Sequence, residues 1–256
     1  MLLAGFDAGQ TSTRCRVCLW QEDGWQIIGE GSGPGVSHLE ASGGAERFRQ
    51  AVLTSLKSAF EGEGERRLDA AVIGASGIEQ GSALQPKATA LLADALSLPE
   101  DRVLATGDER TALRGAFPDG DGIILISGTG MICLGRDHQG KEHRCGGWGW
   151  MLDGAGSAFD LGHQGLQLTL QMADGRRPDH PLRQRMWEQL GCRGHTDVKA
   201  WVVQPSRTAA DLAALAPLLV AAADAGLPAA QDILQRSASA LVSCAATVAR
   251  ALALPQ

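Results

Sequence analysis

The sequence predicts an α/β protein built from two related halves, with a helical C-terminal part. A strand, a tight glycine and threonine turn and a returning strand occupy residues 2–20, and the same pattern returns at 122–136. Only four of the 33 glycines lie after residue 165, where alanine and leucine dominate and helices are expected. With 44% apolar and 20% charged residues, the 256-residue chain has the composition of a globular protein.

Charge and hydropathy exclude several broad classes of partner. The net charge is −6 and the isoelectric point is near 5.5, which disfavours general binding of nucleic acid or anionic membranes. No run of about 18 uncharged apolar residues occurs, so no membrane-spanning helix is expected. Residues 1–7 lack the basic and long apolar regions of a signal peptide. We therefore expect a cytoplasmic protein without a nucleic-acid or membrane partner.

Six cysteines are scattered along the chain. Cys15 and Cys18 have the C-x-x-C spacing found in zinc and redox sites. They lie, however, in an alternating stretch that predicts a strand, where side chains three residues apart face opposite sides. We therefore interpret the cysteines as free thiols of a reducing compartment.

The elements of the first half follow from alternation, turn residues and helical spacing. Asp23-Gly24 is a strong hairpin signal between two alternating stretches. Phe48, Val52 and Leu56 recur at the spacing of one helix face, and Pro86 suits the first turn of a helix. The predicted order is strands at 2–7, 13–20 and 25–31, a glycine-rich loop at 31–44, a helix at 45–60, a strand at 68–73, a helix at 86–98, a strand at 103–106 and a helix at 109–117.

A second cycle begins after residue 117, which predicts a boundary between domains 1–117 and 118–256. Its first strand is strongly apolar, and its last part is rich in alanine and leucine. The predicted order is strands at 122–127 and 131–136, a loop rich in glycine and tryptophan at 144–156, and helices at 157–172, 181–190, 208–225 and 228–254. The repeated strand–turn–strand pattern suggests that the two halves meet at a cleft.

The first motif that carries chemistry is Asp7-Ala8-Gly9-Gln10-Thr11-Ser12-Thr13. A hairpin turn this tight exposes backbone N–H groups, and Gly9 lets a phosphate approach them closely. Thr11 and Thr13 add hydroxyl donors, and Asp7 at the end of its strand is placed to hold hydrated Mg²⁺. An ordinary hairpin turn is the alternative interpretation of this motif taken alone.

The second motif, Ser127-Gly128-Thr129-Gly130, repeats this arrangement in the second half. Two such turns facing across a cleft would hold a nucleoside triphosphate from both sides. Neither turn fits G-x-x-x-x-G-K-[ST], and no lysine lies near them, so the pattern disfavours a P-loop NTPase.

Asp108 follows the apolar strand 103–106 at the start of a predicted helix. It has two compatible interpretations. One is a helix N-cap, and the other is the carboxylate that accepts the hydroxyl proton of an attacking alcohol in phosphoryl transfer. The segment 145–157 combines aromatic residues, glycines and an acid, which suits either a sugar-binding surface or an apolar plug.

Five stretches in this order resemble the N-acetylglucosamine kinase and BadF/BcrA-type ATPase family of the sugar-kinase, actin and heat-shock ATPase superfamily. The stretches are GFDAGQTSTRCRV (5–17), GASG (74–77), VLATGDERTALRGAF (103–117), GIILISGTGMICLGRD (122–137) and CGGWGWMLDGAGSAFDLGHQ (145–164). The resemblance spans about residues 1–190. It implies two ribonuclease-H-like, actin-like ATPase domains that hold ATP and Mg²⁺ between them.

The resemblance also implies roles for individual residues. Asp108 falls where the family has its catalytic base, and Asp7 would act through Mg²⁺. The phosphate-binding positions would be Gly9, Gln10, Thr11, Thr13, Ser127, Gly128, Thr129 and Gly130. The sugar-binding positions would be Ser37, His38, Ser76, Gly77, Asp108, Gly146, Gly147 and Asp153.

Several positions depart from the family pattern. Gln10 replaces a usual glycine, Ser37 replaces a sugar-binding asparagine, and Ile132 stands where animal N-acetylglucosamine kinases carry an asparagine. The family's Gly-Asp-Glu-Gly-Ser is here Asp-Gly-Ala-Gly-Ser at 153–157, which moves the acid by one residue. The sequence ends at Gln256, before the glycine-rich adenosine loop of the family.

These observations predict an ATP-dependent sugar kinase that phosphorylates N-acetylglucosamine, glucosamine or a related hexose. Two alternatives from other classes are an ATP-switched activator of the BadF type and a degenerate sugar-binding sensor. The predicted ligands are ATP, Mg²⁺ and a small sugar. The sequence leaves open whether the protein forms a homodimer.

Overall fold

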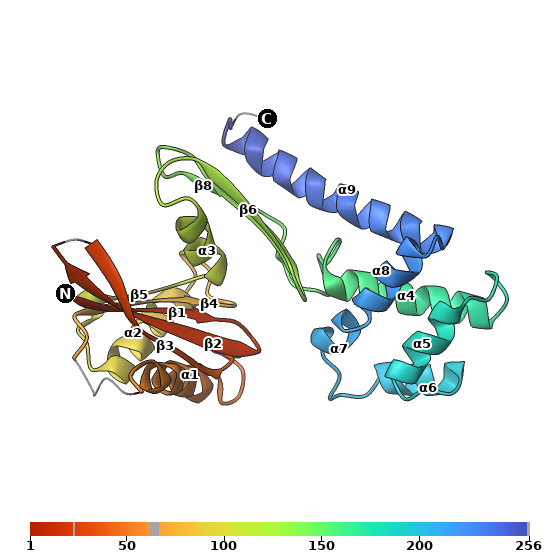
Figure 1. Cartoon of the computed structure of the whole chain (residues 1–256), viewed down its shortest axis with the longest axis horizontal. Helices are drawn as coiled ribbons and strands as arrows, with labels where there is room; N and C mark the ends of the chain where they lie inside the picture. Colours follow the sequence, from red (N-terminus) through yellow and green to blue (C-terminus); the bar gives the residue numbers. More distant parts are fainter. Residues whose placement is uncertain (23, 62–66, 255–256) are drawn as a thin grey trace. The chain divides into compact units, whose positions relative to one another are not determined.

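A computed structural model describes residues 1–22, 24–61 and 67–254. The chain divides into two compact units, residues 1–118 and 119–256, which we call unit 1 and unit 2 (Figure 1). The first is an α/β unit with a mixed five-stranded sheet, and the second combines a three-stranded sheet with helices. That both units are ribonuclease-H-like domains stays a prediction.

The sheet of unit 1 has the strand order β3-β2-β1-β4-β5. β1 and β2 are antiparallel, as are β2 and β3, whereas β4 and β5 run parallel to β1. Gln21 pairs with Gly24 across the β2–β3 connection, while Asp23 of the expected hairpin turn lies outside the described residues. The strands are β1 (Leu2–Ala8), β2 (Ser12–Gln21), β3 (Gly24–Pro34), β4 (Ala70–Ala75) and β5 (Val103–Thr106).

Helices cover both faces of this sheet. Figure 1 shows α1 (Gly44–Ala59) and α2 (Leu84–Leu96) on one face and α3 (Asp108–Ala116) on the other. The larger core lies under α1 and α2 and includes the fully buried Phe48 and Ile73. A short 3-10 helix (Glu100–Arg102) leads into β5. Successive side chains of β1 point to opposite faces of the sheet. Ala4, Phe6 and Ala8 are therefore buried in this core, whereas Gly5 and Asp7 are exposed on the α3 face.

Glycines explain how closely α1 packs on the sheet. Gly29, Gly31 and Gly33 alternate along β3, so they share one face. A β-carbon at Gly31 would overlap the Ser55 carbonyl oxygen, and one at Gly29 would overlap the Ala59 carbonyl oxygen. The predicted loop at 31–44 is wrong in its first residues, because this glycine run continues β3 to Pro34.

Unit 2 begins with an antiparallel sheet in the order β6-β7-β8. β6 (Gly122–Ser127) and β7 (Met131–Arg136) have the predicted bounds, whereas no strand was predicted at β8 (Glu142–Cys145), whose last two residues fall in the predicted loop at 144–156. Its four residues are too few to show a period, and only pairing with β7 reveals the strand. The long helix α9 (Pro228–Ala251) packs on this sheet, with Val248 and Leu252 against Cys133 of β7.

The remaining helices of unit 2 form a second core. They are α4 (Ala158–Ala173), α5 (Pro181–Gln189), α6 (His195–Val202), α7 (Ala209–Ala213) and α8 (Ala216–Asp224). The indole N–H of Trp187 donates to the Thr169 hydroxyl at 2.9 Å within this core. The single helix expected at 208–225 is wrong, because Pro217 in the first turn of α8 has no N–H to continue the hydrogen-bond ladder of α7.

In the described part of the chain, no single helix is long and apolar enough to cross a membrane. The helical stretches 209–224 and 228–251 meet the requirements of length and apolar composition only as a pair, and a bend of 118° separates them.

Candidate functional site

The carboxyl ends of β1, β4 and β5 lie at one edge of the sheet of unit 1, because these three strands are parallel. Asp7 is opposite Gly74 in the ladder, and the Ser76 N–H donates to the Ala8 carbonyl at 2.9 Å. Asp108 follows β5 at the same edge. The structure therefore gathers Asp7, Ser76 and Asp108, which lie far apart in the sequence.

Asp108 is the first residue of α3, and its half-buried carboxyl accepts the Glu109 N–H at 3.1 Å. The N-cap is Gly107, which has no side chain, so the N-cap interpretation of Asp108 is wrong. The Thr111 hydroxyl donates to the Asp108 carbonyl at 2.8 Å and fixes this turn. Burial raises the pKa of Asp108, and the nearby charge of Asp7 raises it further.

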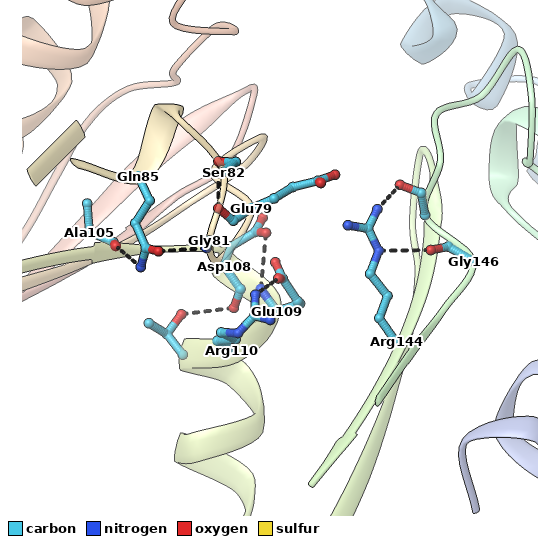
Figure 2. Close-up of polar contacts among 12 residues, drawn as sticks. Glu79, Gly81, Ser82, Gln85, Ala105, Asp108, Glu109, Arg110, Arg144 and Gly146 are labelled. Carbon is cyan, nitrogen blue, oxygen red and sulfur yellow. Dashed lines mark hydrogen bonds and ion pairs between the residues drawn. The ribbon is translucent and has the colours of Figure 1, made fainter. Parts of the chain in front are cut away.

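Glu109, the acid that follows Asp108, is a residue that the sequence interpretation did not consider. Its carboxyl is buried and lies 2.9 Å from the Arg110 guanidinium (Figure 2). Burial raises the pKa of Glu109, and the adjacent charge of Asp108 adds to this rise. A β-carbon at Gly107 would overlap the Glu109 carboxyl, so any other residue there would require the Glu109 side chain to move. The sequence feature that could have drawn attention to Glu109 is the pair of consecutive acids, Asp108 and Glu109, at the start of a predicted helix.

Gln85 ties the start of α2 to the end of β5. Its side-chain amide donates to the Ala105 carbonyl at 3.1 Å, and its amide oxygen accepts the Gly81 N–H at 2.9 Å (Figure 2). Through these two bonds the loop before α2 holds the strand end from which Asp108 projects.

The β1–β2 turn is held by its own backbone. The Gly9 N–H donates to the Ser12 carbonyl at 3.0 Å, and the Gly9 carbonyl accepts the Val36 N–H at 3.0 Å. The side chains of Gln10 and Thr11 are exposed. Thr13 is a correction to the predicted phosphate-binding set: it is fully buried, and its hydroxyl donates to the Pro34 carbonyl at 2.8 Å.

The predicted sugar-binding residues of unit 1 lie beside this turn. Gly77 has a φ of +84°, and a β-carbon there would come within 3.7 Å of the His38 imidazole. His38 is exposed, while Ser37 and Ser76 are half-buried. The structure thus brings His38 next to Gly77 although 39 positions separate them in the chain.

An open groove of about 810 Å³ lies on the α3 face of this sheet. Asp7, Asp108 and Thr111 line it together with Arg14, which pairs with Asp7 across β1 and β2. Arg14 is a second residue that the sequence interpretation missed. The alternation of apolar and polar residues in β2 predicts only that Arg14 points away from the core. Nothing else in the sequence marks it as a residue of the groove.

In unit 2 the β6–β7 turn is fastened to the start of α4. The carbonyls of Gly128 and Thr129 accept the N–H groups of Ala158 and Phe159 at 2.8 and 3.3 Å. The Ser127 hydroxyl donates to the Gly156 carbonyl at 2.8 Å. All four turn residues, Ser127 to Gly130, are exposed. The turn carbonyls are thus engaged by the helix.

Gly146 and Gly147 adopt consecutive left-handed conformations, with φ of +77° and +78°. A β-carbon at Gly147 would lie 2.9 Å from the Ile132 side chain, so there is no room for one. The Arg144 guanidinium donates to the Gly146 carbonyl (Figure 2) and to the Gly147 carbonyl. It also lies 4.4 Å from the centre of the Trp148 ring. Asp153 lies close by, with a carboxyl oxygen 3.4 Å from a β-carbon position on Gly146.

The described residues contain no group of three or more His, Cys, Asp or Glu that could hold a metal ion. Magnesium does not need such a group, because it keeps several waters and takes one or two carboxylates together with phosphate oxygens. The exposed carboxyl of Asp7 at the strand edge fits this mode of binding. Cys15 and Cys18 are free thiols, as expected.

Comparison with known proteins places the chain in a family. Residues 4–255 match the BadF/BadG/BcrA/BcrD ATPase family. The chain belongs to this family. Its structure is also similar to that of a Chromobacterium violaceum protein provisionally named an N-acetylglucosamine kinase, with a TM-score of 0.82 and 29% identity over 99% of this chain and 85% of that chain.

Two curated relatives match part of the chain. The N-acetylmuramic acid/N-acetylglucosamine kinase of Clostridium acetobutylicum is 29% identical over 153 residues, or 60% of this chain and 50% of its own length. The N-acetyl-D-glucosamine kinase of Dictyostelium discoideum is 32% identical over 134 residues, or 52% of this chain and 42% of its own length. The matched stretches therefore span half or less of each relative.

Proposed function

We propose that the protein catalyses the ATP-dependent phosphorylation of N-acetylglucosamine, glucosamine or a closely related hexose. Family membership and the names of its relatives support an ATP-using sugar kinase. The observation that carries the proposal is the position of Asp108, a half-buried carboxyl at the edge of the sheet of unit 1 beside Asp7.

Asp108 acts as the general base in this proposal. Phosphoryl transfer needs a carboxylate that accepts the proton of the attacking sugar hydroxyl. Because burial raises the pKa of Asp108, its carboxylate is a stronger base than an exposed aspartate. The bond from the Glu109 N–H to one carboxyl oxygen fixes the orientation of the Asp108 side chain.

The two glycine turns supply backbone N–H groups to the phosphates of ATP. Gln10 and Thr11 serve this role in unit 1, where the Gly9 N–H is bonded to the Ser12 carbonyl and Gly9 instead leaves room for the phosphate. Ser127, Thr129 and Gly130 serve it in unit 2, where the Gly128 N–H is bonded to the Gly130 carbonyl and Gly128 leaves room in the same way. Fixed N–H groups stabilise the negative charge of a transferring phosphoryl group without reorganising. Mg²⁺ held through Asp7 would neutralise part of that charge.

Sugar recognition is assigned to two groups of residues. Ser37, His38, Ser76 and Gly77 form the first, and Gly146, Gly147 and Asp153 form the second. The left-handed glycines and the Arg144 bonds hold the backbone of the second group in one conformation. Asp153 accepts hydrogen bonds from sugar hydroxyls in this proposal, although it stands one position before the family's acid.

The test is a coupled assay of ADP release with ATP, Mg²⁺ and a panel of N-acetylglucosamine, N-acetylmannosamine, N-acetylmuramic acid, glucosamine and glucose. We expect ADP release to depend on one of the amino sugars, with a phosphorylated sugar as the product. The Asp108→Asn variant is the matched control and should lack this turnover. ATP hydrolysis at the same rate without sugar would instead favour the activator class. Calorimetry that detects sugar binding but no ATP binding would favour a sensor.

A further inference from the structure

Three cysteines of unit 2 meet on one face of its sheet. Cys133 of β7 and Cys145 of β8 are directly opposite in the antiparallel ladder, so their side chains lie on the same face. Cys244 of α9 packs against the same apolar cluster. Cys145 and Cys244 therefore lie against the same cluster, and Cys145 is near enough to raise the pKa of the Cys244 thiol. In the sequence Cys244 lies about a hundred positions after Cys145.

We propose that Cys145 and Cys244 form a reversible disulfide that joins β8 to α9. Both residues are free thiols in the structure. A small-molecule disulfide is the oxidant: it takes two electrons from the pair and is reduced to two thiols. The two S–H bonds break, one S–S bond forms in the protein, and the two protons pass to the released thiols.

Cys145 and Cys244, and not Cys133, form the proposed disulfide because an oxidant can reach their thiols. Cys133 is fully buried, whereas Cys145 and Cys244 are half-buried, so a small disulfide reaches the latter two. A mixed disulfide on either residue then has the other thiol beside it, and intramolecular exchange completes the bond.

The rate of formation should rise with pH, because the thiolate is the attacking species. Burial raises the pKa of Cys244 to about 11. The neighbouring Cys145, Asp153 and Cys133 add to this rise. Burial likewise raises the pKa of Cys133 to about 11. Exchange is therefore expected to be slow at pH 7 and about thirty-fold faster at pH 8.5, because the thiolate fraction of a group with a pKa of about 11 rises about ten-fold per pH unit.

The disulfide would fix the start of the segment that contains Gly146 and Gly147. The bond would also close a loop of about a hundred residues within unit 2, which restricts the unfolded chain. Oxidised protein should therefore melt several degrees higher than reduced protein. The proposal does not rest on the sugar-kinase function, since its readouts are a covalent bond and a melting temperature.

The experiment treats the full chain with oxidised glutathione at pH 7 and pH 8.5, blocks free thiols and maps tryptic peptides without reduction. Trypsin places the three cysteines in separate peptides, 115–136, 145–176 and 237–250. We expect peptides 145–176 and 237–250 to be linked, and the link to disappear after reduction. A wild-type map that shows only glutathione adducts, or a link between 115–136 and 145–176 alone, overturns the proposal.

Two variants sharpen this result. Cys244→Ser should lose both the linked peptides and the rise in melting temperature. Cys192→Ser is the matched control, because Cys192 is a buried thiol in the helical core of unit 2 and should not affect the link. If Cys244→Ser proves unstable, the wild-type peptide map still decides the question. Linked peptides that persist in Cys244→Ser would contradict the proposed pair.

Discussion

The two glycine turns of the molecule share a backbone plan but differ in their surroundings. In each turn a glycine carbonyl is occupied by an N–H from a neighbouring segment, Val36 for Gly9 and Ala158 for Gly128. The β1–β2 turn lies at a strand edge that also carries Asp7 and Asp108. The β6–β7 turn lies instead against the start of a helix.

This difference indicates a division of work. Unit 1 gathers carboxyls whose pKa values burial raises, which suits proton transfer. Unit 2 offers backbone held by helix N–H groups and by Arg144, which suits the binding of a ligand in a fixed orientation. The following predictions would break or sharpen this comparison.

The largest effect is expected from the acids. Asp108→Asn should lower kcat for sugar phosphorylation by about 10²–10⁴-fold while leaving ATP affinity nearly unchanged, because it removes a general base. Asp153→Asn should instead raise KM for the sugar about ten-fold, since it weakens a binding hydrogen bond. Steady-state kinetics with calorimetric ATP titration distinguish the two. An equal loss of kcat in both variants would contradict the division of work.

The next effect concerns the packing of unit 1. Gly31→Ala should destabilise the protein by about 1–3 kcal/mol, because the new methyl group overlaps the Ser55 carbonyl of α1. Gly5→Ala, on β1 of the same sheet, is the matched control, because its β-carbon would meet nothing within 4 Å. Urea denaturation measures both. Equal stability of the two variants would show that α1 can move away from β3.

Alanine in the turns tests phosphate binding with little structural cost. A β-carbon at Gly128 would meet nothing within 4 Å, and one at Gly9 would meet only the Ser12 carbonyl at 3.6 Å. Both variants should therefore fold normally, yet bind ATP about ten-fold more weakly, because the methyl group obstructs phosphate approach. Calorimetry measures the affinity, with Gly115→Ala as control. Unchanged affinity in both variants would remove the turns from the ATP site.

The smallest effect is on the pH dependence of stability. Because the pKa of Asp108 is raised on folding, the folded state binds more protons than the unfolded state once pH exceeds the ordinary value of 3.8. Stability is thus lost as pH rises through the raised pKa. Asp108→Asn should melt a few degrees above wild type at pH 8 and show no such gain near pH 3. Asp179 is the control, because Arg183 lowers its pKa. If Asp179→Asn also melted above wild type at pH 8, the raised pKa of Asp108 would not be the cause of the gain.

Elements with strong local patterns were predicted from the sequence. The strands at 103–106, 122–127 and 131–136 have their predicted bounds, because apolar runs between glycine turns are unambiguous. β8 and α6 were missed, since a four-residue strand and an eight-residue helix are too short to show a clear period and depend on their neighbours. Thr13 was misassigned because its sequence position does not reveal that Pro34 occupies its hydroxyl.

The sequence by itself determined the repeated strand–turn–strand pattern, the order of the glycine turns and the acid after β5, because these depend on local spacing. Tertiary structure decided which groups share an environment. It buried Glu109 beside Asp108, set Arg14 opposite Asp7 and brought Cys244 to Cys145. Burial and charge act through space, and residues far apart in sequence come together only when strands pair and helices pack.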